Sequence, residues 1–280
     1  MHHVIQKNLF NEFGFRYLIE ALELNKYEYT IVNVIPFSHE LTPDIEISSQ
    51  EKVMVWGSLT LDGIAKERGW KPGSFQNENF DMRILHKLYG DKFLNSDAVF
   101  CAFAEMNFDA PMFCRPVHDT KTFSGSVIYP DDLKEWKERI IHLSNTGYSS
   151  LRPNTPVMYA SSKKVDFEAR FFIVDGKVIT GSTYRNFGEV MYQRVEYNNP
   201  MFHPMLQFAE QMVAYWSPIR GPVQELGIHS SHKGPHDSGF VLDIASINGE
   251  YKVIEINCLN SSGFYLCDMN AVVRALENSI

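Results

Sequence analysis

The stretch EYKVIEINCLNSSGFY, residues 250–265, places polar side chains inside a segment that otherwise has the composition of a buried β-strand. Val253, Ile254 and Ile256 are β-branched and apolar, which favours a strand. Glu255 and Asn257 interrupt this pattern two residues apart, so their side chains fall on one face. A carboxylate and an amide on a largely buried strand need partners, because unpaired polar groups are costly to bury.

The segment SGFVLDIASINGEYKVIEIN, residues 238–257, predicts a hairpin that supplies one such partner. A three-residue loop would bring Asp243 opposite Glu255, whereas a two-residue turn would pair Asp243 with Ile254 and separate the carboxylates. Both registers stay open at this level. In the first, Asp243, Glu255 and Asn257 form a cluster of oxygen ligands, which suits Mg²⁺ or Mn²⁺ better than Zn²⁺. A divalent cation would also offset the repulsion of two neighbouring carboxylates.

A second hairpin is predicted in DFEARFFIVDGKVITGSTYRNF, residues 166–187, where Asp-Gly favours a two-residue type I′ turn. Counting back from this turn, we expect Arg170 opposite Gly181 and Glu168 opposite Thr183. One face then carries three charged side chains, Glu168, Arg170 and Arg185. A solvated outer face is the alternative interpretation of these charges.

Between residues 110 and 128 the sequence APMFCRPVHDTKTFSGSVI predicts a strand, an Arg-Pro pair, a polar loop and another strand. Arg115 lies at a strand end and Lys121 lies in the loop before Gly125. Two cations beside a flexible loop are suited to holding phosphate groups.

Composition and charge narrow the classes of function. The chain has 280 residues, 21% of them charged, and a net charge of −8, which disfavours free nucleic acid as the main ligand. A nucleotide held through a metal is compatible with that charge. We expect no membrane span, because no run of about 18 apolar residues occurs, and no secretory signal. The four cysteines show no CxxC spacing, so we expect reduced thiols and a cytoplasmic location.

Residues 1–105 alternate predicted helices and strands (helix 8–24, strands 28–35 and 52–58, helix 80–90), which indicates a small α/β domain. Residues 97–106 fit a buried strand or a short helix. The second domain, residues 106–280, adds helices at 129–144, 201–218 and 268–279 and a strand at 155–161 to the two hairpins.

The order of these motifs resembles the ATP-grasp fold over roughly residues 105–280. The matching pieces are FCRP, DTKTFSG, VMYAS, an E-x-R-F-F-I-V-D-G-K-V hairpin with GSTYR, FVLDIA, and V-I-E-I-N-x-x-N-S-S-G-F. The usual cation-Pro pair of the superfamily is Lys-Pro, and Arg115-Pro116 looks like a divergent clade frequent in phage and bacterial genomes. The resemblance implies an α+β fold in which two sub-lobes hold ATP between their sheets.

The resemblance also implies where ATP is held. Arg115 would reach the α-phosphate side, although its planar fork cannot repeat the contact of a lysine. Lys121 would contact phosphates, and Glu168 would orient Arg170 or touch the ribose. The remaining contacts would come from the main chain of Met158, Tyr159 and Ala160 around adenine, and from the loop containing Asn260 and Gly263 beside the phosphates.

For catalysis, the resemblance implies that Asp243, Glu255 and Asn257 ligate one or two Mg²⁺ ions, with Mn²⁺ as an alternative. Arg170 and Arg185 would neutralise the γ-phosphate or hold an acceptor carboxylate. The reaction typical of the superfamily activates a carboxylate as an acylphosphate, which an amine then attacks. We therefore expect an ADP-forming ligase acting on small-molecule or peptide carboxylates and amines.

Two other functions fit the same motifs: a catalytically silent ATP-binding sensor or scaffold, and a kinase of the same fold that releases a phosphorylated product. ADP formation and the nature of the product would separate the three. The sequence names neither substrate nor the oligomeric state. The loop HSSHKGPH, with His229, His232 and His236, lacks a clear fourth ligand for zinc, and a polar loop is the preferred interpretation.

Overall fold

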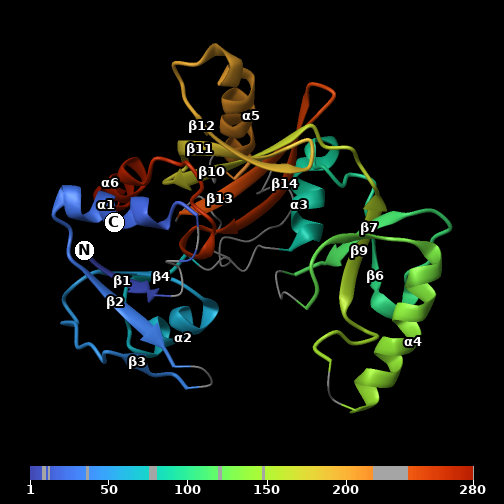
Figure 1. Cartoon of the computed structure of the whole chain (residues 1–280), viewed down its shortest axis with the longest axis horizontal. Helices are drawn as coiled ribbons and strands as arrows, with labels where there is room; N and C mark the ends of the chain where they lie inside the picture. The colour runs from blue at the N-terminus through green and yellow to red at the C-terminus, as the bar shows by residue number, and fades with distance from the viewer. Residues whose placement is uncertain are drawn as a thin grey trace.

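The structure is a computed structural model that describes residues 1–7, 11, 13–35, 38–75, 81–118, 122–146, 149–216 and 239–279. The described residues form three β-sheets. In Figure 1 these lie side by side: the N-terminal sheet at the lower left, the sheet of β10 to β14 in the centre, and the sheet of β6, β7 and β9 at the right. Both termini lie at the left, where the Met1 ammonium donates to Glu277 at 3.3 Å.

The first sheet has the order β3-β2-β1-β4-β5, with β1 parallel to β2 and β4. This confirms an α/β arrangement at the N-terminus. Two elements were not predicted from the sequence, the strand β1 and the helix α2. The elements of this part are β1 His2–Gln6, α1 Phe15–Asn25, β2 Tyr29–Val34, β3 Leu41–Thr42, β4 Val53–Trp56, α2 Leu59–Glu67 and β5 Pro72–Gly73.

The second sheet has the order β6-β9-β7-β8, and helix α4 packs on it through Leu133 and Ile140. Its strand β6 pairs with β9 although it precedes the expected domain boundary at residue 105. We therefore propose a boundary before helix α3. The elements are α3 Met82–Tyr89, η2 Gly90–Lys92, β6 Val99–Ala102, η3 Phe103–Glu105, β7 Met112–Pro116, β8 Ser126–Ile128, α4 Pro130–Thr146 and β9 Pro156–Ser161.

The third sheet is antiparallel, with the order β12-β11-β10-β13-β14. Strand β12 was not predicted from the sequence. The elements are β10 Phe167–Val174, β11 Lys177–Asn186, β12 Glu189–Val195, η4 Pro200–Phe202, α5 His203–Ala214, β13 Phe240–Ile247, β14 Glu250–Cys258, η6 Leu259–Ser261 and α6 Met269–Ser279.

Alternate residues of β10 face two different cores, as the two-residue period of a strand requires. Phe171 packs in the cluster beneath α5, whereas Phe172 packs in a cluster with α1, α6 and the N-terminal sheet. In that second cluster, the Phe264 ring lies 5.8 Å from the Trp56 ring and 6.1 Å from the Phe172 ring, centroid to centroid. The N-terminal part is thus docked against the face of the third sheet that carries the charged residues.

The first predicted hairpin has the expected turn but a different register. Val174 pairs with Lys177, and both turn residues have positive φ, 49° and 67°, as a type I′ turn requires. Two bulges then shift β11 along β10, so that Arg170 lies opposite Ser182 rather than Gly181 and Glu168 opposite Arg185 rather than Thr183. A bulge inserts one extra residue, which counting from the turn cannot reveal.

The second hairpin combines features of both predicted registers. Its turn is the two-residue type, because Ile247 pairs with Glu250 and the turn residues have φ of 51° and 82°. That turn alone would pair Asp243 with Ile254. Instead the register shifts between Asp243 and Ile244, leaves Ile254 as the extra residue, and places Asp243 opposite Glu255. The two carboxylates are therefore neighbours, for a reason that neither prediction contained.

Among the described residues, no helix has the length and apolar character that crossing a bilayer demands.

Candidate nucleotide and metal site

The centre of the site is the pairing of Asp243 on β13 with Glu255 on β14. The side-chain amide nitrogen of Asn257 donates to both carboxylates, at 3.1 Å to Asp243 Oδ2 and 2.9 Å to Glu255 Oε1. One NH₂ group can satisfy both oxygens because Asn257 lies two residues after Glu255, on the same face of β14. The three predicted metal ligands are therefore brought together.

Asp243 is held by an arginine of the same sheet. Arg170 lies directly opposite it on β10 and donates from Nε to Oδ1 at 2.9 Å and from Nη2 to Oδ2 at 2.8 Å. The two residues are 1% and 9% exposed. Two parallel N–H···O⁻ bonds form the strongest type of ion pair, and burial makes it costly to break.

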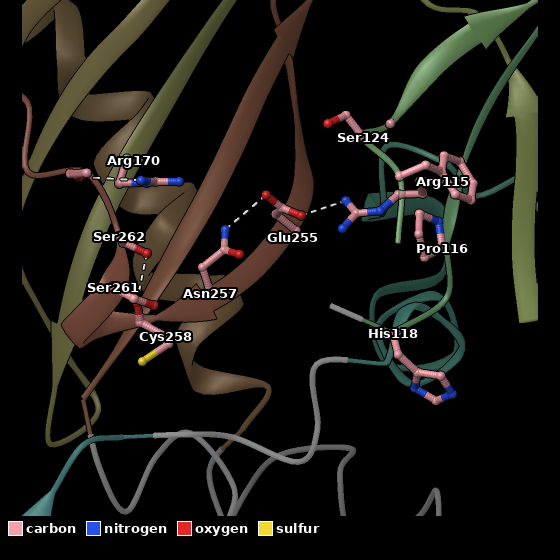
Figure 2. Close-up of a pocket in the computed structure, with 13 residues that line it drawn as sticks. Arg115, Pro116, His118, Ser124, Arg170, Glu255, Asn257, Cys258, Ser261 and Ser262 are labelled. Atoms are coloured by element: carbon pink, nitrogen blue, oxygen red, sulfur yellow. Dashed lines mark hydrogen bonds and ion pairs between the residues drawn. The ribbon is translucent and has the colours of Figure 1, made fainter. Parts of the chain in front are cut away.

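Glu255 is held by an arginine of a different sheet. Arg115, at the end of β7, donates from Nη1 to Glu255 Oε2 at 2.5 Å. Figure 2 shows this pair spanning the space between the strand of Glu255 and the segment of Arg115 and Pro116. Because one nitrogen makes the contact and both side chains are partly exposed, the pair is open to exchange.

The local electrostatics differ for the two carboxyls. Burial raises the pKa of Asp243, although Arg170 opposes that effect. Burial also disfavours the charged form of Glu255, but Arg115 and Asn257 outweigh it and lower the pKa of this carboxyl. For Arg170, the charge of Asp243 outweighs the effect of burial and raises the pKa of the guanidinium. Both arginines therefore act as counter-ions.

The donor set fits a hard divalent cation. The amide NH₂ of Asn257 is fixed by two carboxylates, which leaves its Oδ1 without a hydrogen bond to any described residue, and Figure 2 shows that oxygen facing the space beside Glu255. Carboxylate and amide oxygens are the ligands that Mg²⁺ and Mn²⁺ prefer, and Mg²⁺ commonly takes one or two carboxylates together with water and phosphate oxygens.

Two cavities meet at Arg115. A cavity of about 450 Å³, which we term the central cavity, is lined by Arg115, Arg170, Glu255, Asn257 and Gly263, among others. A cavity of about 260 Å³, which we term the linker cavity, is lined by Arg115, Ser161, Lys163, Glu168 and Arg185, among others. Since Arg115 borders both, the cavities offer one elongated ligand a cation near its middle.

The prediction for the adenine pocket requires a correction. Strand β9 lies inside its sheet, and the residues 158–160 pair with β6 on one side and β7 on the other. Their N–H and C=O groups are therefore used by the sheet rather than available to a base. The chain leaves the sheet after Ser161, where Asp97 accepts from Ser161 N at 3.0 Å and from Lys163 Nζ at 2.6 Å. Burial opposes ionisation of Asp97, but Lys163 and Ser161 lower its pKa to about 2.

Asn260 also differs from its predicted role. Its side chain is 1% exposed, accepts from Phe75 N at 2.8 Å and donates to Val55 O at 2.7 Å. Its own carbonyl accepts from Gly57 N at 3.1 Å. These contacts fasten the loop after β14 to the N-terminal part, so Asn260 positions that loop and does not face the cavity. Gly263, in contrast, does line the central cavity.

Glu168 and Arg185 lie opposite each other and both line the linker cavity. Arg185 is exposed and forms no hydrogen bond or ion pair with any other residue in the described ranges. It is thus separated from Arg170, which lines the central cavity. Lys121 and the three histidines of the HSSHKGPH loop lie outside the described residues.

Sequence reasoning missed three groups that line or support the central cavity. Ser261 and Ser262 line it from the loop after β14, and His118 lines it from the segment after Arg115. Tyr184 and Tyr265 lie under Arg170, with ring centroids 5.7 and 5.2 Å from its guanidinium carbon. The serines were within the quoted motif, but nothing in the sequence indicated that the tyrosines meet.

Comparison with known proteins agrees with this geometry. The model of an ATP-grasp domain family, the second family of its clade, matches residues 93–275. No curated protein matches the chain significantly.

Among solved structures, the chain is similar to D-alanine–D-alanine ligase from Bacillus anthracis complexed with ATP (TM-score 0.57, 16% identity, covering 100% of this chain and 97% of that chain). It is also similar to D-cycloserine synthetase DcsG (TM-score 0.55, 11% identity, 100% and 99% covered). A third is ATP-grasp ligase PsnB complexed with minimal precursor (TM-score 0.54, 12% identity, 100% and 99% covered). At these identities the likeness shows the fold.

Proposed function

Because the chain belongs to this ATP-grasp domain family, we propose that it is an ATP- and Mg²⁺-dependent carboxylate–amine ligase. The observation that carries this proposal is the cluster of Asp243, Glu255 and Asn257, which presents oxygen ligands beside a cavity bordered by arginines. Such a cluster suits a cation that carries phosphate groups, since Mg²⁺ leaves coordination positions for phosphate oxygens.

The two cavities support a definite orientation for the nucleotide. We place the triphosphate in the central cavity and the adenosine in the linker cavity, with Arg115 at the α-phosphate between them. The linker residues 161–163 border the base, because they have left the sheet, and Glu168 faces the ribose. Arg185 contributes its positive charge on the nucleoside side rather than at the transferred phosphate.

The proposed reaction has two steps. A substrate carboxylate oxygen attacks the γ-phosphorus, the bond to the β-γ bridging oxygen breaks, and ADP leaves. An amine then attacks the carbonyl carbon of the acylphosphate, and phosphate leaves as the amine loses a proton. Bound Mg²⁺ would neutralise charge on the phosphates and hold them in line.

The chain's own residues supply position and charge. Glu255 and the Asn257 carbonyl hold the cation, and Arg115 leaves Glu255 to contact phosphate. The positive field of both arginines favours the charge that develops on phosphate oxygens, and it acts in a partly buried site where water screens it weakly.

Substrates and location remain on the level of classes. Ligases of small amino acids and of a peptide precursor share the fold, which supports a small-molecule, amino-acid or peptide carboxylate and an amine. All four cysteines are free thiols, which supports a cytoplasmic location.

The test is a screen of ADP release over carboxylate and amine pairs, followed by mass spectrometry of the product. An amide supports the ligase, a stable phosphate ester or anhydride supports a kinase, and no ADP with any pair supports a binding protein. Glu255→Gln should lower ADP release at least about 100-fold, because metal contacts contribute several kcal/mol. Glu250→Gln, an exposed carboxylate on the same strand, is the control. Unchanged ADP release in a folded Glu255→Gln protein would refute the assignment.

A further inference from the structure

We propose that Arg170 is a permanent counter-ion that takes the place of a second metal, so that the site binds one divalent cation per nucleotide. This inference rests on the proposed function, because it concerns the same carboxylate cluster. It assigns Arg170 as a positioning residue for Asp243 rather than as a contact for an acceptor carboxylate.

The oxygens of Asp243 are already fully used. Oδ1 accepts from Arg170 Nε, and Oδ2 accepts from Arg170 Nη2 and from Asn257 Nδ2. A carboxylate binds a metal through the same lone pairs that accept hydrogen bonds. Coordination through Asp243 would therefore require Arg170 to withdraw from a residue that is 1% exposed.

Arg170 is confined on several sides. Its guanidinium carbon lies 5.7 Å from the Tyr184 ring and 5.2 Å from the Tyr265 ring, and its Nη1 lies 3.4 Å from Gly263 O. Stacked rings favour a guanidinium because their faces carry negative electrostatic potential. Withdrawal would break two charge-assisted hydrogen bonds and leave two buried charges apart, which is strongly unfavourable.

Glu255 differs in each of these respects. Its partner Arg115 belongs to another sheet, contacts it with one nitrogen, and borders both cavities. When the arginine turns to a phosphate, Glu255 is released to a cation and no charge is left unpaired. One carboxylate is thus available to a metal and the other is not.

The charge balance gives the same result. Asp243 and Glu255 carry two negative charges, and Arg170 and Arg115 carry two positive charges. Exchange of Arg115 for one divalent cation on Glu255 satisfies this carboxylate. A second cation would need another carboxylate and would lie close to the retained Arg170, so Coulomb repulsion would oppose it.

The test counts metal ions on the folded wild-type protein. The chain is dialysed to equilibrium against Mn²⁺ and the non-hydrolysable analogue AMPPNP, and excess metal and nucleotide in the protein compartment are measured by mass spectrometry and absorbance. Low-temperature EPR of the same sample distinguishes an isolated Mn²⁺ from a spin-coupled pair. We expect one Mn²⁺ per bound AMPPNP and the spectrum of an isolated ion.

Two Mn²⁺ per bound nucleotide with a coupled spectrum would overturn the inference and leave the proposed function standing. Absence of AMPPNP binding would instead refute the proposed function, and the inference with it.

A variant tests the position of Arg170 itself. Arg170→Met should bind a second Mn²⁺ as its concentration rises into the millimolar range, doubling the ratio of metal to nucleotide. Arg68→Met, which breaks a remote Arg–Asp pair, should keep a ratio of one. A folded Arg170→Met protein that stays at one would count against the inference, and if this variant fails to fold, the wild-type ratio decides.

Discussion

Asp243 and Glu255 lie opposite each other on neighbouring strands, yet their arginine partners belong to different parts of the molecule. The inner pair, Arg170–Asp243, joins strands β10 and β13 of one sheet through two hydrogen bonds. The outer pair, Arg115–Glu255, joins the second sheet to the third through one nitrogen and is more exposed.

The difference shows how one cluster can be both stable and reactive. A pair within a sheet has its geometry fixed by the strand register, so it persists whether or not a ligand is present. A pair between sheets depends on their separation and can exchange partners when a ligand enters. The inner pair therefore supports the fold, and the outer pair is the one that ligand binding changes.

Breaking the inner pair should have the largest effect on stability. Arg170→Met leaves the Asp243 carboxylate buried without its counter-ion, and we expect a loss of about 3–5 kcal/mol in the free energy of unfolding. Denaturant unfolding followed by circular dichroism measures this loss, with Arg68→Met as the matched control. The double variant Arg170→Met/Asp243→Leu should recover part of the loss, because no buried charge then remains unpaired.

A loss below about 1 kcal/mol in Arg170→Met would contradict the inner pair's role and would place it with ordinary surface ion pairs.

Breaking the outer pair should separate stability from binding. Arg115→Met should cost about 1 kcal/mol or less in stability, since solvent reaches both partners. It should weaken AMPPNP binding about 10- to 100-fold, which corresponds to the loss of one hydrogen bond between charged groups. Calorimetric titration measures the affinity. Equal destabilisation by Arg115→Met and Arg170→Met would remove the distinction between the two pairs.

A third contact sharpens the comparison with a smaller effect. His3 is fully buried, accepts from Trp56 Nε1 at 3.0 Å through Nδ1, and contacts Glu277 at 3.0 Å through Nε2. Burial lowers the pKa of His3 below 6.5, despite the neighbouring Glu277. A histidine whose folded pKa is depressed contributes stability above its unfolded pKa, and that contribution falls as the pH drops below about 6.5.

Thermal unfolding between pH 7.5 and 5.5 checks this prediction. The wild-type protein should lose up to about 1.4 kcal/mol per pH unit through His3, and His3→Asn should show a shallower dependence. His39→Asn removes an exposed histidine and serves as the control. Identical pH dependence in wild type and His3→Asn would argue against a neutral buried imidazole.

The sequence by itself determined the family, the two hairpins and the identity of the oxygen ligands. These follow from local chemistry: Asp-Gly and Asn-Gly set tight turns, and the two-residue period of a strand puts Glu255 and Asn257 on one face. The Arg-Pro pair at the end of β7 was likewise found where the alternating pattern placed it.

The tertiary structure alone decided the register and the partners. The bulge at Ile254 brings Asp243 to Glu255, and it lies several residues from the turn that the sequence specified. Likewise, β9 became an interior strand because β6 and β7 flank it, and Asn260 was buried because the N-terminal part docks on its loop. A residue's own chemistry sets which bonds it can form, but its partners depend on contacts between segments far apart in the chain, and a local pattern does not contain those contacts.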